Sequence, residues 1–241
     1  MIVDRGGEGL VVIEQEAHAR LTGQLAARLP FLVGDHAAFV AAARVHDNGW
    51  READRAATVD ADGQPHTFNN VPDDIYEDLW RRGIERAAEV DALVGLLVGL
   101  HGARFFQTRQ SPGMRALVED ERRRQDRVLA ELELGGSCDD LPEDVAAASA
   151  WIAVLDALSL LLCGAGLPDR ISPRVGQQPY TLTRSGTRVA VDPWPYEGDL
   201  LTATVAARTI PAGPYADDEA LRTALDAAPW TTRQVTVAPG P

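Results

Sequence analysis

The sequence predicts a mainly α fold, a helical bundle that carries a small antiparallel β-sheet appendage. Apolar residues recur at the three- and four-residue spacing of helices through residues 14–168, which we expect to form one helical domain. Residues 169–241 contain Val- and Thr-rich runs in which apolar and polar residues alternate, as they do in strands. Residues 1–13 place two short apolar runs around a glycine-rich stretch, which predicts an N-terminal hairpin that could pack with the β-rich appendage.

The predicted helices follow from apolar faces and from residues that begin or end a helix. Pro30 ends the first helix because proline cannot continue one, and Asp35 can cap the second. Gly49 marks the end of the second helix, and the polar residues 60–72 then form a loop long enough to act as a lid or binding loop. The six helices of this domain are expected over residues 16–29, 35–49, 73–89, 90–102, 114–134 and 143–163.

The C-terminal part is expected to contain strands that are joined by turns. Ser185 and Gly186 predict a hairpin turn between the first two of these strands. Residues 217–227 have the spacing of one short helix. The strands are expected over residues 180–183, 188–192, 201–210 and 234–237.

The net charge of −13 at pH 7 excludes one class of partner. Non-specific binding to nucleic acid needs a positively charged surface, so we expect no nucleic-acid partner. The 23 basic residues are all arginine. The absence of lysine excludes a Schiff base, a pyridoxal-phosphate aldimine and a phosphate-loop lysine.

Nothing in the sequence indicates export or insertion into a membrane. The first ten residues lack the basic and apolar regions of a signal peptide. The longest apolar run, residues 150–163, is interrupted by Asp156 and is shorter than the ~20 residues that span a bilayer. Cys138 and Cys163 do not require an oxidising compartment. We therefore expect a cytoplasmic protein without a membrane partner.

Asp156 is the most informative single residue, because it lies within an apolar helical run. An ionised carboxylate in an apolar interior must be paired, protonated or bound to a metal ion. Its neighbours one helical turn away, Ile152 and Leu160, offer no partner. Histidines on the apolar faces of other helices are therefore the candidates, and these are His18, His46 and His101.

His46 and Asp47 are adjacent near the end of the second helix. Neighbouring side chains on a helix point ~100° apart, so these two can bind one ion only where the helix ends, and Gly49 places that end close by. Imidazole combined with carboxylate suits Mn, Fe, Zn, Co or Ni, and no cysteine is placed for a thiolate site. The sequence therefore predicts a site for a divalent transition metal ion.

The order of His18, His46-Asp47 and Asp156 resembles that of the HD-domain superfamily of metal-dependent phosphohydrolases, and this implies an HD-like helical bundle. Over most of its length the chain also resembles the DUF3891 family of uncharacterised bacterial proteins. The segments that carry this second resemblance are residues 15–18 with 23–26, 46–50, 100–102, 156–160 with 163, and 193–195.

The HD resemblance implies roles for several residues. The implied metal ligands are His18, His46, Asp47 and Asp156, with His101 as a further candidate. Arg51 and Arg104 could hold an anionic substrate through bidentate hydrogen bonds. Trp50 either packs in the core or forms a wall of the substrate pocket. Glu52 or Asp54 could serve as the general base.

The implied reaction is hydrolysis of a small phosphorylated or other anionic metabolite by a metal-activated water molecule. Some HD proteins are instead di-iron oxygenases with additional histidines between the HD pair and the last aspartate. Here that interval contains only His101 and the loop residue His66, which leaves an iron-dependent oxygenase or lyase open. A third alternative is a non-enzymatic protein that binds a metal or a small molecule. An exposed strand edge could also pair two chains as a homodimer.

Overall fold

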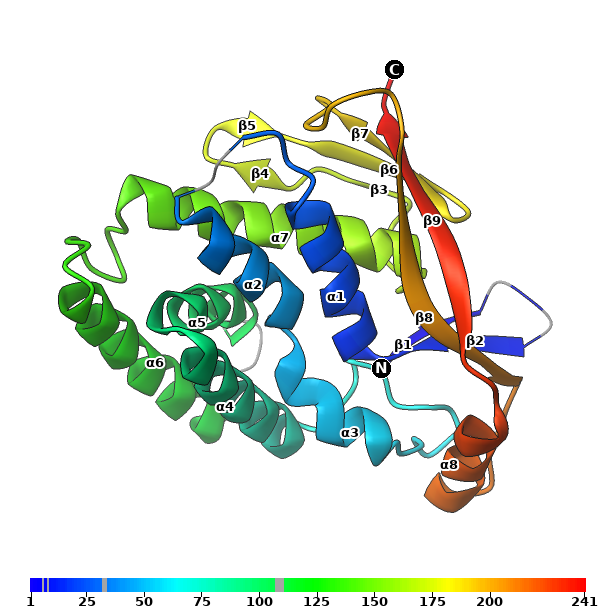
Figure 1. The fold of residues 1–241 in the computed structure, drawn as a ribbon. Coiled ribbons are helices and arrows are strands. Elements are labelled where there is room, and N and C mark those ends of the chain that lie inside the picture. Colours follow the sequence, from blue (N-terminus) through cyan, green and yellow to red (C-terminus); the bar gives the residue numbers. More distant parts are fainter. Residues whose placement is uncertain (6, 8, 32–33, 107–110) are drawn as a thin grey trace.

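The structure is a computed structural model that describes residues 1–241 apart from residues 6, 8, 32–33 and 107–110. In this part of the chain, a group of helices packs against a large curled sheet (Figure 1). The helices are α1 (Gln15–Ala26), α2 (His36–Val45), the 3₁₀ helix η1 (Asn48–Trp50), α3 (Arg51–Arg55), α4 (Asp73–Val90), α5 (Ala92–Phe106), α6 (Pro112–Glu131), α7 (Glu143–Cys163) and α8 (Asp218–Ala227).

The strands of the large sheet come from both ends of the sequence. The described strands are β1 (Ile2–Asp4), β2 (Gly9–Ile13), β3 (Arg170–Ile171), β4 (Arg174–Val175), β5 (Gln178–Pro179), β6 (Thr181–Ser185), β7 (Arg188–Asp192), β8 (Leu201–Pro211) and β9 (Thr231–Pro239). Seven of them form one sheet in the order β1-β2-β8-β9-β7-β6-β3, and β4 pairs with β5 separately. The pairing of β7 with β9 is parallel, while the other pairs are antiparallel, so the sheet is mixed.

The expected mainly α fold with a small antiparallel appendage is wrong. The described residues are about 49% helix and 21% strand, and their seven-stranded sheet curls into a half-barrel, so the fold is mixed α/β rather than all-α. The N-terminal hairpin is confirmed, but it is part of this sheet because β2 pairs with β8. Both β8 and β9 are also longer than the runs that predicted them. The β2–β8 and β7–β9 pairings join residues far apart in sequence, and local alternation of apolar and polar residues cannot reveal such pairings.

The long strand β8 shows why the sheet packs against the helices. Its side chains alternate between buried and exposed, with Leu201, Ala203, Val205 and Ala207 on the buried face. That face lies against α1, and Gln24 of α1 exchanges hydrogen bonds with the backbone of Thr204. One continuous hydrophobic core contains Leu21 of α1 together with Val205 of β8. Helix α1 is therefore held between the sheet and the other helices.

Helix α7 runs through the centre of the core, and its predicted limits are confirmed at both ends. Among the described helices it is the one long and apolar enough to cross a membrane, but 72% of its most apolar window is buried inside the protein. Such burial is typical of a core helix. Gly164 ends α7 in the left-handed conformation, with φ of 75°, which glycine adopts without a steric penalty.

Candidate metal centre

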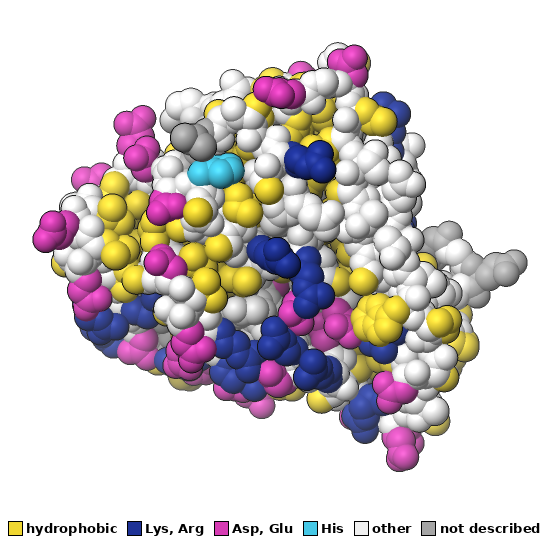
Figure 2. Space-filling view, in the orientation of Figure 1, with side chains coloured by type: hydrophobic (Ala, Val, Ile, Leu, Met, Phe, Trp, Pro, Cys, Tyr) yellow, Lys and Arg dark blue, Asp and Glu magenta, His cyan; other side chains and the backbone are white. Residues whose placement is uncertain are grey.

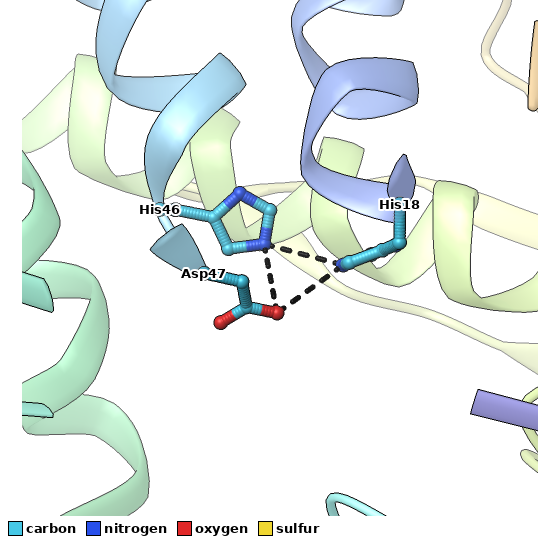
Figure 3. Close-up of side chains that lie close together, drawn as sticks. All are labelled: His18, His46 and Asp47. Carbon is cyan, nitrogen blue, oxygen red and sulfur yellow. Dashed lines mark hydrogen bonds and ion pairs between the residues drawn. The ribbon is translucent and has the colours of Figure 1, made fainter. Parts of the chain in front are cut away.

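Three elements bring the predicted ligands together in the interior. His18 lies in α1, His46 and Asp47 follow the last residue of α2, and Asp156 lies in α7. All four side chains are buried, with exposed fractions between 0% for His18 and 8% for Asp47. Figure 3 shows the ring nitrogens of His18 and His46 and one carboxylate oxygen of Asp47 directed toward a common point.

The end of α2 explains how two adjacent residues reach the same point. His46 retains helical backbone angles, whereas Asp47 leaves them, with φ of −110° and ψ of 20°. The chain then enters η1, where Gly49 packs directly against α4. A Cβ atom on Gly49 would overlap the carbonyl oxygen of Leu79, so a side chain there would push η1 away. Glycine at this position therefore permits the turn that directs Asp47 toward His46.

The donor atoms are spaced like the ligands of one ion. His18 Nε2 lies 3.2 Å from His46 Nε2, and 2.9 Å from Asp156 Oδ1. His46 Nε2 lies 3.4 Å from the same Asp156 oxygen, while Asp47 Oδ2 lies 3.7 Å from His18 Nε2 and 3.6 Å from His46 Nε2. Ligand bonds of ~2.1 Å place neighbouring donors about 3.4 Å apart in a tetrahedron and about 3.0 Å apart in an octahedron. These buried groups can therefore hold a metal ion.

The two histidine rings are oriented from behind by hydrogen bonds. His46 Nδ1 lies 2.9 Å from the carbonyl oxygen of Ala43, which can only accept, so Nδ1 carries a proton and in the neutral ring Nε2 presents a lone pair. His18 Nδ1 lies 2.8 Å from Ser159 Oγ, whose hydroxyl donates to the carbonyl oxygen of Asp156. His18 Nδ1 therefore donates to Ser159. Such partners fix the tautomer and orientation of metal-binding histidines.

The carboxylates and rings also shift one another's protonation. Burial lowers the pKa of His46, but the charge of Asp47 and the hydrogen bond to Asp156 outweigh burial and raise it to about 9. Burial raises the pKa of Asp156, yet the hydrogen bonds from His18 and His46 lower it well below its usual range. Burial raises the pKa of Asp47. Without an ion, the raised pKa of His46 and the lowered pKa of Asp156 favour a protonated His46 ring beside an ionised Asp156.

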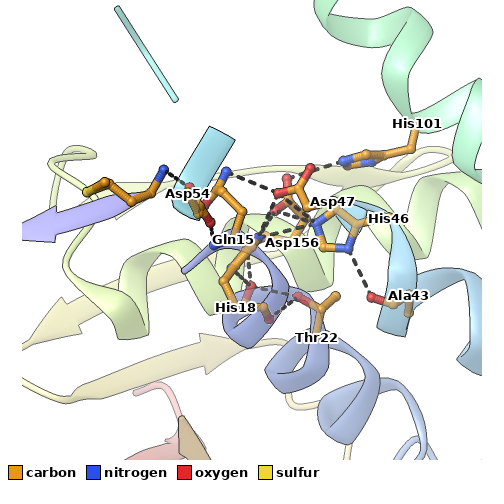
Figure 4. Close-up of polar contacts among 11 residues, drawn as sticks. Gln15, His18, Thr22, Ala43, His46, Asp47, Asp54, His101 and Asp156 are labelled. Carbon is orange, nitrogen blue, oxygen red and sulfur yellow. Dashed lines mark hydrogen bonds and ion pairs between the residues drawn. The ribbon is translucent and has the colours of Figure 1, made fainter. Parts of the chain in front are cut away.

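Two further side chains border the cluster (Figure 4). His101 Nε2 lies 3.6 Å from Asp156 Oδ2, the carboxylate oxygen that does not face His18. His46, His101 and Asp156 form a second trio with donor atoms close enough to hold an ion. Burial lowers the pKa of His101 to about 3, so this ring is neutral. Gln15 Nε2 donates to Asp47 Oδ2 at 3.1 Å.

A cavity of about 270 Å³ opens beside the cluster. Asp47, His101 and Asp156 contribute to its lining, and Trp50 forms part of its wall. Trp50 is only 5% exposed, so it both packs in the core and borders the cavity.

The two arginines predicted to bind substrate contact other parts of the protein. Arg51 donates through Nε and Nη2 to the carboxylate of Glu16. It lines a different pocket, together with Arg86. Arg104 lies 3.3 Å from the hydroxyl of Ser149, and burial lowers its pKa. Neither arginine lines the cavity beside the cluster. Figure 2 shows arginines interleaved with acidic side chains over the face that α3 and α4 form.

The two predicted general bases are also engaged outside the cluster. Glu52 forms a bidentate ion pair with Arg86 at 2.8 and 2.9 Å. Asp54 is buried, lies 2.5 Å from the amino group of Met1 and accepts a hydrogen bond from the backbone N–H of Gln15. The structure thus brings the histidines and aspartates together but does not bring Glu52 or Asp54 to them.

Sequence reasoning did not single out the residues that support the ligands. Gln15 lies three residues before His18, Thr22 lies four residues after it, and Ser159 lies three residues after Asp156. Each is therefore one helical turn from a ligand, on the same face of its helix. Polar residues at these offsets on an otherwise apolar face were the signal that could have identified them. Thr22 Oγ1 lies 2.8 Å from Ser159 Oγ and thus extends the hydrogen-bonded chain behind His18.

A family model matches residues 1–212 of this chain, and its description is "Protein of unknown function (DUF3891)". No curated protein matches the sequence, and no solved structure matches the fold. The match covers the cluster and strands β1 to β8, and it ends before α8 and β9. The comparisons therefore give a family but no reaction, and the HD superfamily is not among the findings.

Proposed function

Because the chain belongs to the DUF3891 family, which has no assigned function, we propose its function from the metal centre. We propose that the protein is an HD-type, metal-dependent hydrolase of a small metabolite. The metal would be one divalent transition ion, Mn, Fe, Zn, Co or Ni, because imidazole and carboxylate donors suit these ions. The proposed ligands are His18, His46, Asp47 and Asp156.

The observation that carries this proposal is the convergence of four buried donor atoms beside a cavity. A divalent ion in such a site lowers the pKa of a bound water molecule toward neutrality and polarises the bond to be broken. Asp47 and Asp156 line the cavity, whereas His18 is fully buried. The carboxylate side of the cluster is thus the side that a substrate can approach.

The chain's own residues would orient the reactants. Gln15 holds Asp47 through its amide N–H, and Ser159 holds the ring of His18. His101 borders the cavity as a neutral ring, so it can accept or donate a hydrogen bond to a water molecule or substrate there. These contacts fix the reacting groups before the substrate arrives, which is how a rigid site lowers a barrier.

We propose a phosphorylated or otherwise anionic reacting group as the substrate's head. Among the described residues, no arginine lines the cavity, so the positive charge that meets this group would come from the ion. This arrangement differs from sites in which arginine side chains clamp a phosphate. It favours small phosphate esters and related anions over long polyphosphates.

The experiment is a hydrolysis screen with defined metal content. The metal-free protein is loaded with one equivalent of Mn, Co, Fe or Zn, and phosphate release is followed from a panel of sugar phosphates, nucleotides and aryl phosphates. Release that disappears in Asp156→Asn, with the fold intact by circular dichroism, supports the proposal. Protein that binds metal but hydrolyses no member of the panel with any ion counts against it.

A second candidate function is an iron-dependent oxygenase or lyase on the same residues. The observation that favours it is the second trio of His46, His101 and Asp156, which offers a place for another ion beside the first. Both trios contain His46, whose Nε2 can bind only one ion, so a second ion would be held mainly by His101 and Asp156. Two equivalents of iron and oxygen uptake in the presence of substrate would favour this function over hydrolysis.

A further inference from the structure

Aromatic side chains line much of the cavity beside the metal cluster. They come from four separate parts of the chain, namely η1, the loop that follows α3, α4 and α5. Helix α4 contributes two of them one turn apart. The aromatic lining residues are Trp50, Phe68, Tyr76, Trp80 and Phe105.

The rings form a continuous wall rather than isolated contacts. The ring centres of Trp50 and Tyr76 are 6.1 Å apart, and those of Tyr76 and Trp80 are 6.2 Å apart. Phe105 lies with its ring nearly parallel to that of Trp80 at 6.2 Å, and edge-on to His101 at 5.1 Å. The wall therefore reaches from η1 to His101 at the edge of the cluster.

The charges in the described lining belong to the metal cluster. Asp47 and Asp156 are the two carboxylates, and a divalent ion in the proposed site would balance them. Beyond them the described lining consists of the aromatic wall, the neutral ring of His101, Leu160 and Leu167, and the polar residues Gln15 and Asn69. A charged group placed against Leu160 and Leu167 would lose its hydration without a partner, which is unfavourable. The part of the cavity that these apolar residues line thus suits an uncharged, apolar group.

The size of the cavity limits that group further. Its volume of about 270 Å³ is near the lower end of the roughly 300–1,000 Å³ of small-molecule sites. Flat rings fill the space between aromatic walls well, because they can stack on one ring while their edge meets the face of another. One ring or two fused rings would fit beside a reacting group at the metal.

We infer that this cavity binds a planar aromatic group of the substrate, so that the substrate is an aromatic molecule with a hydrolysable anionic head. The head would meet the metal, and the ring would lie along the wall from Trp80 to Phe105. The reaction assigned to the head rests on the proposed hydrolase function. Binding of the ring does not rest on that function, because the aromatic wall is present whether or not the cluster holds a metal ion.

The test uses a pair of matched phenylalanine variants. Phe105 lines the cavity, is 36% exposed and contacts Trp80. Phe31 is 39% exposed and contacts Trp151 at 5.4 Å, but it does not line the cavity. Phe105→Ala and Phe31→Ala therefore remove the same side chain, with similar exposure, from comparable tryptophan contacts.

The first measurement is binding of 2-naphthol to the metal-free protein by calorimetry, with cyclohexanol and tetramethylammonium as comparison probes. We expect 2-naphthol to bind most tightly, and Phe105→Ala to weaken it about tenfold, whereas Phe31→Ala changes it less than about twofold. Equal losses in both variants, tighter binding of tetramethylammonium, or no binding of 2-naphthol would each overturn the inference.

The second measurement separates this inference from the hydrolase proposal. If the metal-loaded protein is a hydrolase, kcat/KM for 2-naphthylmethyl phosphate should exceed that for propyl phosphate, since both have an alcohol as leaving group, and Phe105→Ala should reduce the ratio about tenfold with metal content unchanged. Hydrolysis without preference for the aromatic ester overturns the aromatic site alone. Binding of 2-naphthol without any hydrolysis overturns the hydrolase function and leaves the aromatic site standing.

Discussion

The Nε2 atoms of His18 and His46 face each other at 3.2 Å, and each ring is held from behind through its Nδ1 atom. In neutral rings held this way, both facing nitrogens present lone pairs. Two lone pairs at this distance repel each other unless a proton or a metal ion lies between them. The arrangement therefore favours a bound cation, and the carboxylates of Asp47 and Asp156 supply the balancing charge.

The first prediction is that His46→Gln abolishes metal binding, because this ring belongs to both trios of donor atoms. Elemental analysis of purified wild-type protein should show bound transition metal, and the variant should show less than a tenth of that content. Metal at about 100 times its Kd should also stabilise the wild-type protein by about 2.7 kcal/mol. It should leave the melting temperature of the variant unchanged.

The control for that experiment is His36→Gln, because His36 begins the same helix but lies outside the cluster. It should retain the metal content of the wild-type protein. Unchanged metal content in His46→Gln would show that the ion binds elsewhere.

The second prediction concerns Ser159, which receives the hydrogen bond from His18 Nδ1. Ser159→Ala should weaken metal binding about tenfold, because loss of such a supporting hydrogen bond frees the ring to rotate. Ser149 is a buried serine of the same helix that contacts Arg104 instead. Ser149→Ala should leave the metal affinity unchanged. Competition with a chelating indicator measures the metal affinity of both variants. Equal affinities would show that Ser159 does not support the metal site.

The third prediction is a pH dependence of metal binding. In the metal-free protein the pKa of His46 is raised to about 9, above its ordinary value, so the ring is protonated at neutral pH. An ion can bind only the deprotonated ring, and binding therefore releases a proton. The metal affinity should rise up to about tenfold per pH unit between roughly pH 7 and 9 and level off above that range. An affinity that stays constant across this range would contradict the protonation state assigned to His46.

The fourth prediction tests the turn that directs Asp47 into the cluster. Gly49→Ala would place a methyl group against the backbone of Leu79 and should destabilise the protein by about 2 to 3 kcal/mol. Urea unfolding measures this change. Gly7→Ala is the control, because a Cβ atom at Gly7 would meet nothing within 4 Å. Equal stability of the two variants would show that η1 can shift away from α4 without penalty.

The central helix and the meeting of the buried histidines and aspartates could be predicted because the local sequence pattern indicates both. A single apolar run contains all of α7, and burial of Asp156 in that run follows from its neighbours. The cost of burying a carboxylate then points to the histidines on other apolar faces. The structure brings His18 and His46 to within 3.4 Å of the same Asp156 oxygen, which agrees with that reasoning.

The mixed sheet and the surroundings of the cluster could not be predicted in the same way. Strand β7 was located correctly, but nothing in its own residues shows that β9 would pair beside it in parallel. Likewise Arg51 and Glu52 lie only four and five residues after Asp47, yet their directions depend on the packing of α3 against α1 and α4. Their partners, Glu16 and Arg86, lie on those helices. Such directions are set by tertiary contacts between distant segments.

The position of β9 has a consequence for the order in which the protein can assemble. It is the last described strand in the chain, yet it lies between β8 and β7 in the sheet. Before it is synthesised, the strands that precede it form two separate groups with unpaired edges. Helix α1 packs against β8, and α7 packs against β6 and β7, so His18 and Asp156 rest on different groups. The sheet that supports both helices should therefore become continuous only after residues 231–239 have left the ribosome.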